Sequence, residues 1–191
     1  MAAKESTMLS LGTVAPAFAL HDFNGKLYQL SDFNNAKGLL IAFICYHCPF
    51  VQHIRREFAQ FASEYQAKGL AIVAIASNDI DAYPQDGPAG MQAEATQFNY
   101  RFPYLLDDTQ AVAKAYQAAC TPDLYLFDSA QRLFYRGQFD ASRPRNTIPV
   151  TGADLRAAAD ALLTGLPAPK EQYPSIGCSI KWKPGNAPAY A

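Results

Sequence analysis

The sequence predicts an α/β domain built around one strand–helix–strand unit. The apolar run at residues 39–43 has the length and composition of a strand that is buried on both faces. From Val51 onward apolar residues recur every three or four positions, which is the pattern of a helix with one buried face. Gly69 ends this helix, and residues 70–76 form a second apolar run. The two strands are therefore expected to be parallel neighbours joined by a right-handed crossover.

Composition limits the class of protein. With 191 residues, of which 50% are hydrophobic, the chain is long enough for one domain with a sizeable core. A formal net charge of −1 gives no attraction for nucleic acid or an anionic membrane, so neither is expected as a partner. The N-terminus lacks the apolar core of a signal peptide, and we expect a cytoplasmic protein. In that compartment four cysteines indicate catalysis or metal binding rather than structural disulfides.

The segments on either side of the first strand and helix carry clear turn signals. Residues 1–10 are expected to form a loose N-terminal arm. Asn24-Gly25 lies between two apolar alternations and predicts the turn of a β-hairpin. After the second strand, residues 77–90 form a polar loop. Such a loop at the carboxyl end of a parallel strand either shapes a substrate groove or is a plain solvated connection.

The C-terminal half predicts further helices, a second hairpin and a tail. The expected elements are helices near 91–99 and from Asp107 or Asp108 to Ala119, a hairpin at 124–136, and a last helix that begins with a Thr151/Asp154 capping box and ends at Gly165. This places the domain at residues 11–165. Residues 166–191 form a proline-rich extension that is too apolar for a disordered tail, so we expect it to dock on the domain.

A Cys-x-x-Cys motif, Cys45 to Cys48, lies where the first buried strand meets the helix. A helix N-terminus favours a thiolate over a thiol, and Pro49 suits the first helical turn. We expect Cys45 to be exposed at the helix tip as the low-pKa nucleophile, and Cys48 to be shielded and to resolve mixed disulfides. His47, between them, can stabilise the thiolate. The alternative is a pair of structural cysteines or half of a zinc site.

Taken together, the order of elements resembles the thioredoxin fold, and several motifs narrow the resemblance. The N-terminal Gly12-Thr13-x-x-Pro16-x-Phe18 is similar to the redoxin branch, which includes the alkyl hydroperoxide reductase/thiol-specific antioxidant proteins. The segments 45–51, 119–123 and 177–183 resemble one group of bacterial thioredoxin family proteins. The resemblance covers about residues 10–185 and implies a central mixed sheet flanked by helices, with an N-terminal β-hairpin and an irregular C-terminal tail.

The resemblance also implies roles for individual residues. Cys45 matches the nucleophile and Cys48 the resolving cysteine of a thiol–disulfide oxidoreductase, with Tyr46 and His47 as supporting residues between them. Pro122 matches the cis-proline of the fold, and the backbone of Thr121 would pair with an extended substrate strand. No cofactor or metal is implied. The expected partners are a protein or small-molecule thiol or disulfide and a further redox partner.

Two departures from the family patterns keep alternatives open. Leu39 stands where thioredoxins have a buried aspartate, which leaves the general base unassigned. Ala42 stands where peroxiredoxins have a threonine, which argues against efficient peroxide reduction. The first alternative is nevertheless a thiol peroxidase in which peroxide oxidises Cys45 and Cys48 resolves the sulfenic acid. The second is a metal-binding or structural site made of all four cysteines, which are Cys45, Cys48, Cys120 and Cys178.

Cys120 and Cys178 lie outside the Cys-x-x-Cys motif. Cys120 is two residues before Pro122, so the fold places it near the active-site end of the sheet. Our hypothesis is that the tail folds over this side and brings Cys178 close to Cys120, as a second thiol pair or a relay. The alternative is an inert Cys178 packed on a remote face.

Overall fold

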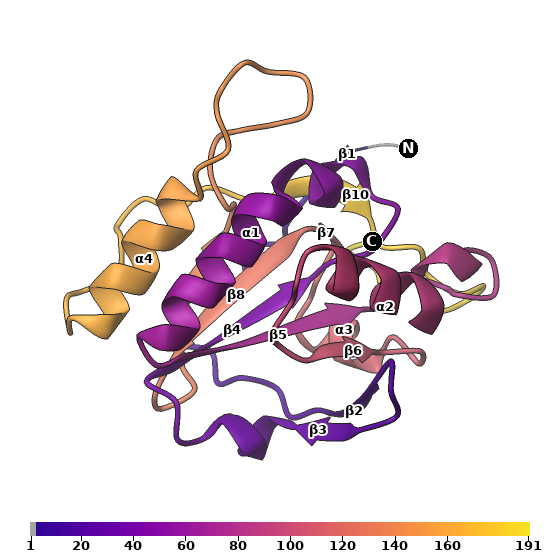
Figure 1. The fold of residues 1–191 in the computed structure, drawn as a ribbon, viewed down its shortest axis with the longest axis horizontal. Helices are drawn as coiled ribbons and strands as arrows, with labels where there is room; N and C mark the ends of the chain where they lie inside the picture. The colour runs from indigo at the N-terminus through magenta and orange to yellow at the C-terminus, as the bar shows by residue number, and fades with distance from the viewer. Residues whose placement is uncertain (1–2) are drawn as a thin grey trace.

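A seven-stranded mixed sheet forms the centre of the structure (Figure 1), a computed structural model that describes residues 3–191. The strand order is β3-β2-β6-β5-β4-β8-β9. The bounds are β2 (Ala19–Asp22), β3 (Leu27–Gln29), β4 (Gly38–Phe43), β5 (Leu70–Ala76), β6 (Tyr104–Leu106), β8 (Asp123–Asp128) and β9 (Leu133–Gly137). The predicted mixed sheet flanked by helices is confirmed.

Helices cover both faces of this sheet. They are α1 (Pro49–Ala67), α2 (Pro88–Gln97), α3 (Ala111–Ala115) and α4 (Ala153–Leu163), with the short 3-10 helices η1 (Leu30–Phe33) and η2 (Pro84–Asp86). Leu40 and Ala42 of β4 pack in the core on the side of α1, α2 and α4. Leu39, Ile41 and Phe43 pack on the opposite side with α3. Within residues 3–191 no helix has the length and apolar character needed to cross a membrane.

The strand–helix–strand unit has the predicted topology. β4 and β5 are parallel, with Ile41 opposite Val73, and α1 connects them. Gly69 follows α1 at φ +100°, a conformation that favours glycine. The predicted hairpins are β2–β3 and β8–β9. β6 pairs in parallel with β5 and was not expected, because its three residues are too few to show a periodic pattern.

A second, three-stranded sheet lies above the carboxyl end of the central sheet (Figure 1). Its order is β1 (Ala3–Glu5), β10 (Ile176–Ser179) and β7 (Cys120–Thr121), all antiparallel. The expectation of a loose arm at residues 1–10 is therefore wrong for the part that forms β1, because β10 supplies its hydrogen-bond partners. The extension at residues 166–191 packs on the domain: β10 is the middle strand, and Trp182 packs on the α3 side of the core.

The start of α4 and the end of α3 differ from the prediction. No Thr151/Asp154 capping box forms; α4 starts after Gly152, and the carboxylate of Asp140 accepts the backbone N–H groups of Thr151 and Gly152 instead. Asp107 does accept N–H groups at the start of α3. That helix ends at Ala115 rather than at residue 119, because Gln117 turns to a φ of +53°.

Candidate active site

The Cys-x-x-Cys motif lies at the carboxyl end of β4. Cys45 follows the strand, and Cys48 is the N-cap residue of α1, with Pro49 as the first helical residue. Both are free thiols, and both are buried, with exposed fractions of 1% for Cys45 and 0% for Cys48. The expectation that Cys45 is exposed at a helix tip is therefore wrong. The helix begins only after both cysteines. Thr121, the polar loop after β5 and the β10 tail cover the two thiols.

Thr121 contacts both sulfur atoms. Its Oγ1 lies 3.3 Å from Cys45 Sγ, and its carbonyl oxygen accepts a hydrogen bond from Cys48 Sγ at 3.1 Å. The Thr121–Pro122 peptide bond is cis, the isomer that the resemblance implies. However, the backbone of Thr121 does not present a free edge, because it already pairs with Cys178 of β10. The expected pairing of this residue with a substrate strand is therefore blocked in this conformation.

The polar loop after β5 closes over the motif from the other side. Asp86 is fully buried and accepts two hydrogen bonds from His47, at 3.1 Å from the backbone nitrogen and at 2.6 Å from Nδ1. Asn78 Nδ2 donates to the same carboxylate at 2.8 Å, and the ring of Tyr83 stacks on His47 with centroids 5.5 Å apart. The loop therefore contacts the motif and is not a plain solvated connection, while its role in shaping a substrate groove stays a prediction.

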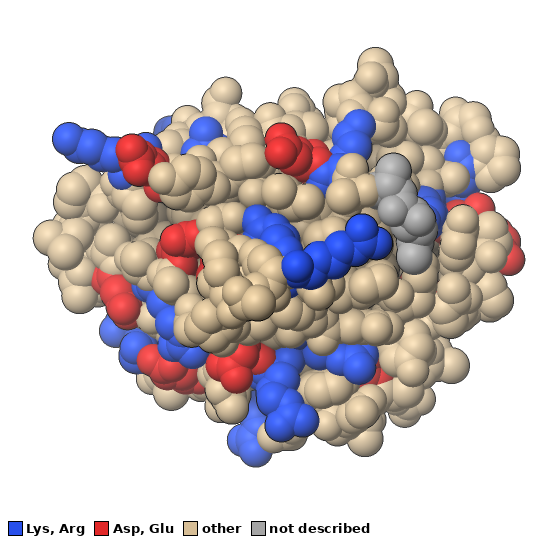
Figure 2. Space-filling view, turned by 90° about the horizontal axis from the view of Figure 1, so that it is seen from above, with Lys and Arg blue, Asp and Glu red and all other residues tan. Residues whose placement is uncertain are grey.

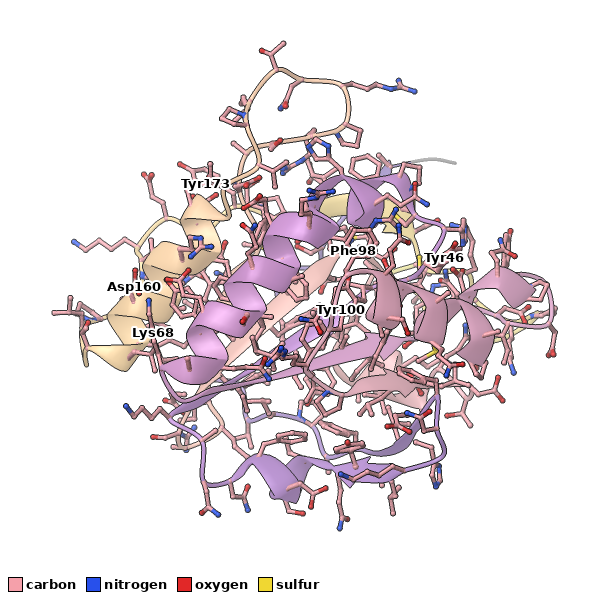
Figure 3. All side chains as sticks on the ribbon, viewed as in Figure 1. Tyr46, Lys68, Phe98, Tyr100, Asp160 and Tyr173 are labelled. Atoms are coloured by element: carbon pink, nitrogen blue, oxygen red, sulfur yellow. The ribbon has the colours of Figure 1, made fainter. Side chains whose placement is uncertain are left out.

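Asn78 also ties the loop to the tail. Its Oδ1 accepts the backbone N–H of Lys181, while its Nδ2 donates to Asp86. Tyr46, the other residue inside the motif, is partly buried and lies close to Gly90 of α2. In Figure 3 Tyr46 lies near the end of the sheet that carries α2, whereas Lys68 and Asp160 lie at the opposite end. The tail, the loop and α2 therefore enclose the motif.

Cys178 and Cys120 lie in neighbouring strands but point in different directions. Cys178 is paired with Thr121, and Cys120 with the next residue of β10, so their side chains fall on opposite faces of this small sheet. The Cys178 side chain belongs to the same buried cluster as Cys48, and each of the two thiols shifts the pKa of the other. The Cys120 thiol faces the carbonyl oxygens of Pro122 and Ser175, at 3.6 and 3.9 Å. The tail does fold over the active-site side, but the proximity of Cys178 to Cys120 is only between backbones.

Three neighbouring thiols change one another's acidity. The pKa of Cys48 is lowered, first by hydrogen bonds from the thiols of Cys178 and Cys45 and also by the backbone N–H of Val51, against the opposing effect of burial. The pKa of Cys45 is raised by its hydrogen bond to Cys48 and by burial. The pKa of Cys178 is raised for the same two reasons. In the reduced protein these donors gather around Cys48 and favour its thiolate rather than that of Cys45, which is opposite to the expectation from the sequence.

The four cysteines do not converge on a common site. Within residues 3–191, the one set of three ligand atoms that all lie within 4.8 Å of one another comes from Cys45, His47 and Asp86. A thiolate, an imidazole and a carboxylate suit zinc chemically. Two of these three groups are already hydrogen-bonded to each other, at 2.6 Å, so the geometry equally fits a histidine oriented by a carboxylate next to a thiol.

Comparison with known proteins places this geometry in a family. The AhpC/TSA family model matches residues 11–136, which include the motif, the polar loop and the cis-proline. The chain belongs to the AhpC/TSA family. An uncharacterized conserved protein from Geobacillus kaustophilus is 54% identical over 97% of this chain and 98% of its own, with a TM-score of 0.95. The similarity to the Geobacillus kaustophilus protein therefore extends over nearly the whole chain and is not limited to the residues that the family model matches.

More distant relatives of this AhpC/TSA protein carry functional names. The thiol-disulfide oxidoreductase ResA of Bacillus subtilis (strain 168) is 29% identical over 130 residues, which are 66% of this chain and 65% of ResA. The chain thus matches about two thirds of the length of that relative. A thiol:disulfide interchange protein of the thioredoxin family from Chlorobium tepidum TLS has a TM-score of 0.62 at 15% identity, over 81% of this chain and 98% of that one. The predicted thioredoxin-like fold is confirmed.

A second buried polar cluster lies between α1, α2 and β6. Glu94 is fully buried, neither of its carboxylate oxygens has a hydrogen-bond partner among the described residues, and the nearest cation is Arg55 at 3.7 Å. The hydroxyl groups of Tyr100 and Tyr104 are also buried without partners among residues 3–191. Burial raises the pKa of Glu94 to about 8, although Arg55 opposes the shift. In Figure 3 Tyr100 lies between α1 and α2.

Sequence reasoning missed Asp86, Asn78 and Glu94. Asp86 is one of several acidic residues in a polar loop, and no local pattern separates it from its exposed neighbours. Glu94 lies in a helix with no clear apolar face, where a glutamate is ordinarily solvent-exposed. Only the contacts made by distant segments distinguish these side chains.

Proposed function

We propose that this protein is a thiol–disulfide oxidoreductase whose Cys45–Cys48 pair cycles between dithiol and disulfide. The observation that carries the proposal is the placement of Cys48: it is the N-cap residue of α1, and its buried thiol lies in one cluster with Cys45 and has a lowered pKa. A thiol with a low pKa is a good leaving group in thiol–disulfide exchange. The relationship to the thiol-disulfide oxidoreductase ResA supports the same reaction class.

The exchange follows from the roles of the two sulfurs. In the oxidised protein a substrate thiolate attacks Cys45 Sγ, the Cys45–Cys48 bond breaks, and its electron pair leaves on Cys48 as a thiolate. A second substrate thiolate then attacks the mixed disulfide at the substrate sulfur, which releases Cys45 as a thiolate. Overall the substrate loses two electrons as a disulfide, and the protein gains them as two thiols. The reverse sequence reduces a substrate disulfide.

His47 and Asp86 supply the proton transfer that Leu39 cannot. One ring nitrogen of His47 lies within 4.8 Å of Cys45 Sγ, and the fully buried carboxylate of Asp86 fixes the ring through Nδ1. A histidine held in this way can pass a proton to or from the thiol, directly or through one water molecule. It therefore protonates the Cys45 thiolate when that group leaves, and removes the proton when Cys45 attacks.

The test is disulfide exchange of the full chain with glutathione. Incubation in glutathione buffers of graded potential, followed by acid quenching, alkylation and mass spectrometry, should show a reversible Cys45–Cys48 disulfide. Cys48→Ser should accumulate a mixed disulfide at Cys45, and Cys45→Ser should not. Peroxide consumption is measured in parallel. A faster reaction with peroxide than with any disulfide would favour the thiol peroxidase and contradict the proposal.

The role of the His47–Asp86 pair is tested with a matched pair of variants. Asp86→Asn should slow exchange at neutral pH about tenfold, because one charge-assisted hydrogen bond contributes roughly 1.4 kcal/mol. Asp81→Asn is the control, since the Asp81 side chain in the same loop is 87% exposed. Equal rates in both variants would remove Asp86 from the mechanism.

A further inference from the structure

Cys178 lies where a third thiol could exchange with the active-site pair. β10 holds its backbone opposite Thr121, and the carbonyl oxygen of Thr121 lies 3.1 Å from Cys48 Sγ. The Cys178 side chain belongs to the same buried cluster as Cys45 and Cys48, with an exposed fraction of 3%. Of all neighbouring groups, the Cys178 thiol has the largest effect on the pKa of Cys48, and the Cys45 thiol has the second largest. Cys48 therefore has two potential disulfide partners: Cys45 from the strand–helix junction and Cys178 from the tail.

The close approach of the tail depends on a glycine. A Cβ atom at Gly177 would lie 2.0 Å from the carbonyl oxygen of Thr121, closer than any real contact. Only glycine lets β10 run this near to Thr121, which brings the side chain of Cys178 to the active-site sulfur. An inert buried cysteine on a remote face, the alternative from the sequence, does not describe this position.

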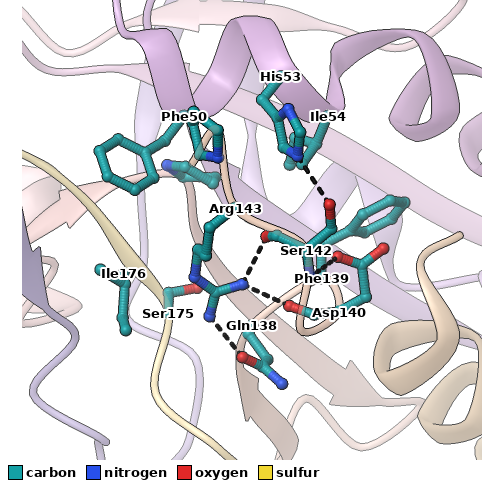
Figure 4. A pocket seen from close by; sticks show the side chains of 12 residues that line it. Phe50, His53, Ile54, Gln138, Phe139, Asp140, Ser142, Arg143, Ser175 and Ile176 are labelled. Carbon is teal, nitrogen blue, oxygen red and sulfur yellow. Dashed lines mark hydrogen bonds between the residues drawn. The ribbon is translucent and has the colours of Figure 1, made fainter. Parts of the chain in front are cut away.

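Cys178 also reaches a cavity that the Cys45–Cys48 pair does not line. The cavity has a volume of about 510 Å³, and its walls include Pro49, Phe50, Ile176, Arg143 and Arg145. None of its described lining residues is acidic. Arg143 is held in place by the carbonyl oxygens of Asp140 and Ser142 and by the side chain of Gln138 (Figure 4). Figure 2 looks down on the molecule from above, where Lys and Arg side chains gather near the middle of the face.

We propose that Cys178 is a third redox thiol, which carries the disulfide from Cys45–Cys48 to a Cys48–Cys178 bond at the wall of this cavity. The Cys178 thiolate attacks Cys48 Sγ, the Cys48–Cys178 bond forms and the Cys45–Cys48 bond breaks. The electron pair leaves on Cys45, which takes up the proton that Cys178 released. The step is neutral in electrons and protons, so it needs no further oxidant or reductant.

The relay lets the disulfide react with external thiols at two different positions. A substrate exchanges at Cys45 on the side of the His47 loop, and a second thiol enters the cavity and attacks Cys178. Two arginines and apolar walls suit a small thiol that carries an anionic group. The relay rests on the proposed function, because Cys48 must first form a disulfide with Cys45.

The decisive experiment removes Cys45 and tests whether Cys48 then forms a disulfide with Cys178. Cys45→Ser, in the full chain, is treated with diamide, which accepts two electrons and two protons from a pair of thiols. The chain is then alkylated, digested without reduction and mapped by mass spectrometry. The expected product is one Cys48–Cys178 disulfide per chain, absent from Cys45→Ser/Cys178→Ser and unchanged in Cys45→Ser/Cys120→Ser. In oxidised wild type, acid-quenched maps should contain both the Cys45–Cys48 and the Cys48–Cys178 linkages.

The cavity is tested with two thiols of similar size and opposite charge. Oxidised protein should be reduced about tenfold faster by 2-mercaptoethanesulfonate than by cysteamine at equal thiolate concentration, a difference of roughly 1.4 kcal/mol. Cys178→Ser should abolish that preference. Arg145→Gln should reduce this preference roughly threefold, as the loss of one exposed charge at the cavity predicts. Arg101→Gln removes an exposed arginine that does not line the cavity, and should leave the preference unchanged.

The outcomes separate the relay from the function on which it rests. Three free thiols in diamide-treated Cys45→Ser, together with an intact Cys45–Cys48 disulfide in wild type, would overturn the relay and leave the oxidoreductase in place. Failure of wild type to form the Cys45–Cys48 bond would overturn both. A charge preference that persists in Cys178→Ser would show that the anionic thiol reacts elsewhere, and would overturn the assignment of the cavity.

Discussion

Apart from any redox role, Cys178 should control the acidity of Cys48. Hydrogen bonding by the Cys178 thiol is the largest of the effects that lower the pKa of Cys48. Cys178→Ala removes the donor and should raise that pKa. Cys178→Ser replaces the thiol with a hydroxyl group, which donates at least as well, and should leave the pKa low while abolishing any disulfide at this position. The two variants thus separate hydrogen bonding from redox chemistry at one residue.

The expected size of the shift follows from the number of donors. The thiolate of Cys48 keeps the Cys45 thiol, Thr121 and the Val51 N–H when Cys178 is truncated, so only part of the stabilisation is lost. A hydrogen bond to a charged group contributes about 1.5 kcal/mol, which corresponds to a rise in the pKa of Cys48 of about one unit in Cys178→Ala.

The measurement is the ultraviolet absorbance of the thiolate as a function of pH in reduced protein. Subtracting the titration of Cys48→Ser isolates the signal of Cys48, and circular dichroism at each pH confirms that the fold is retained. If Cys178→Ala titrates like wild type, Cys178 does not control the acidity of Cys48. The same conclusion follows if the pKa of Cys48 rises as far in Cys178→Ser as in Cys178→Ala, because only the first variant keeps a donor.

Two further predictions concern the buried carboxyl group and the tail. Because burial raises the pKa of Glu94 to about 8 from an ordinary 4.5, its contribution to stability is complete below pH 4.5 and is lost as the pH rises through 8. The free energy of unfolding should therefore fall by on the order of 4 kcal/mol across this range, and denaturant titrations of Glu94→Gln should show a flatter profile; an unchanged slope would contradict the assignment. Gly177→Ala should displace β10 from Thr121, so that Cys178 is alkylated under native conditions at least as fast as an exposed thiol and stability falls by about 1–3 kcal/mol. Continued protection of Cys178 in this variant would mean that β10 does not need the close approach.

Much of the fold was predictable because its signals are local. The apolar run of β4, the period of α1 and the terminating Gly69 specify a βαβ unit from neighbouring residues alone, and Asn24-Gly25 specifies the first hairpin. The junction that carries Cys45 and Cys48 follows from the same patterns. Elements with weak local signals were missed or misplaced: β6 is three residues long, and α3 ends early.

The sequence by itself thus determined the chemistry of this protein: two thiols at a strand–helix junction in a thioredoxin-like fold. The tertiary structure decided the surroundings of those thiols. Cys178 and Asp86 are brought to the motif by segments 130 and 38 residues away from Cys48, and no local pattern encodes such contacts. The partner of Cys178 was decided by register, because side chains alternate along a strand and a shift of one residue would have turned this thiol toward the face of Cys120. The acidity of each thiol was decided in the same way, since a pKa depends on burial and on the donors that the rest of the chain places around the sulfur.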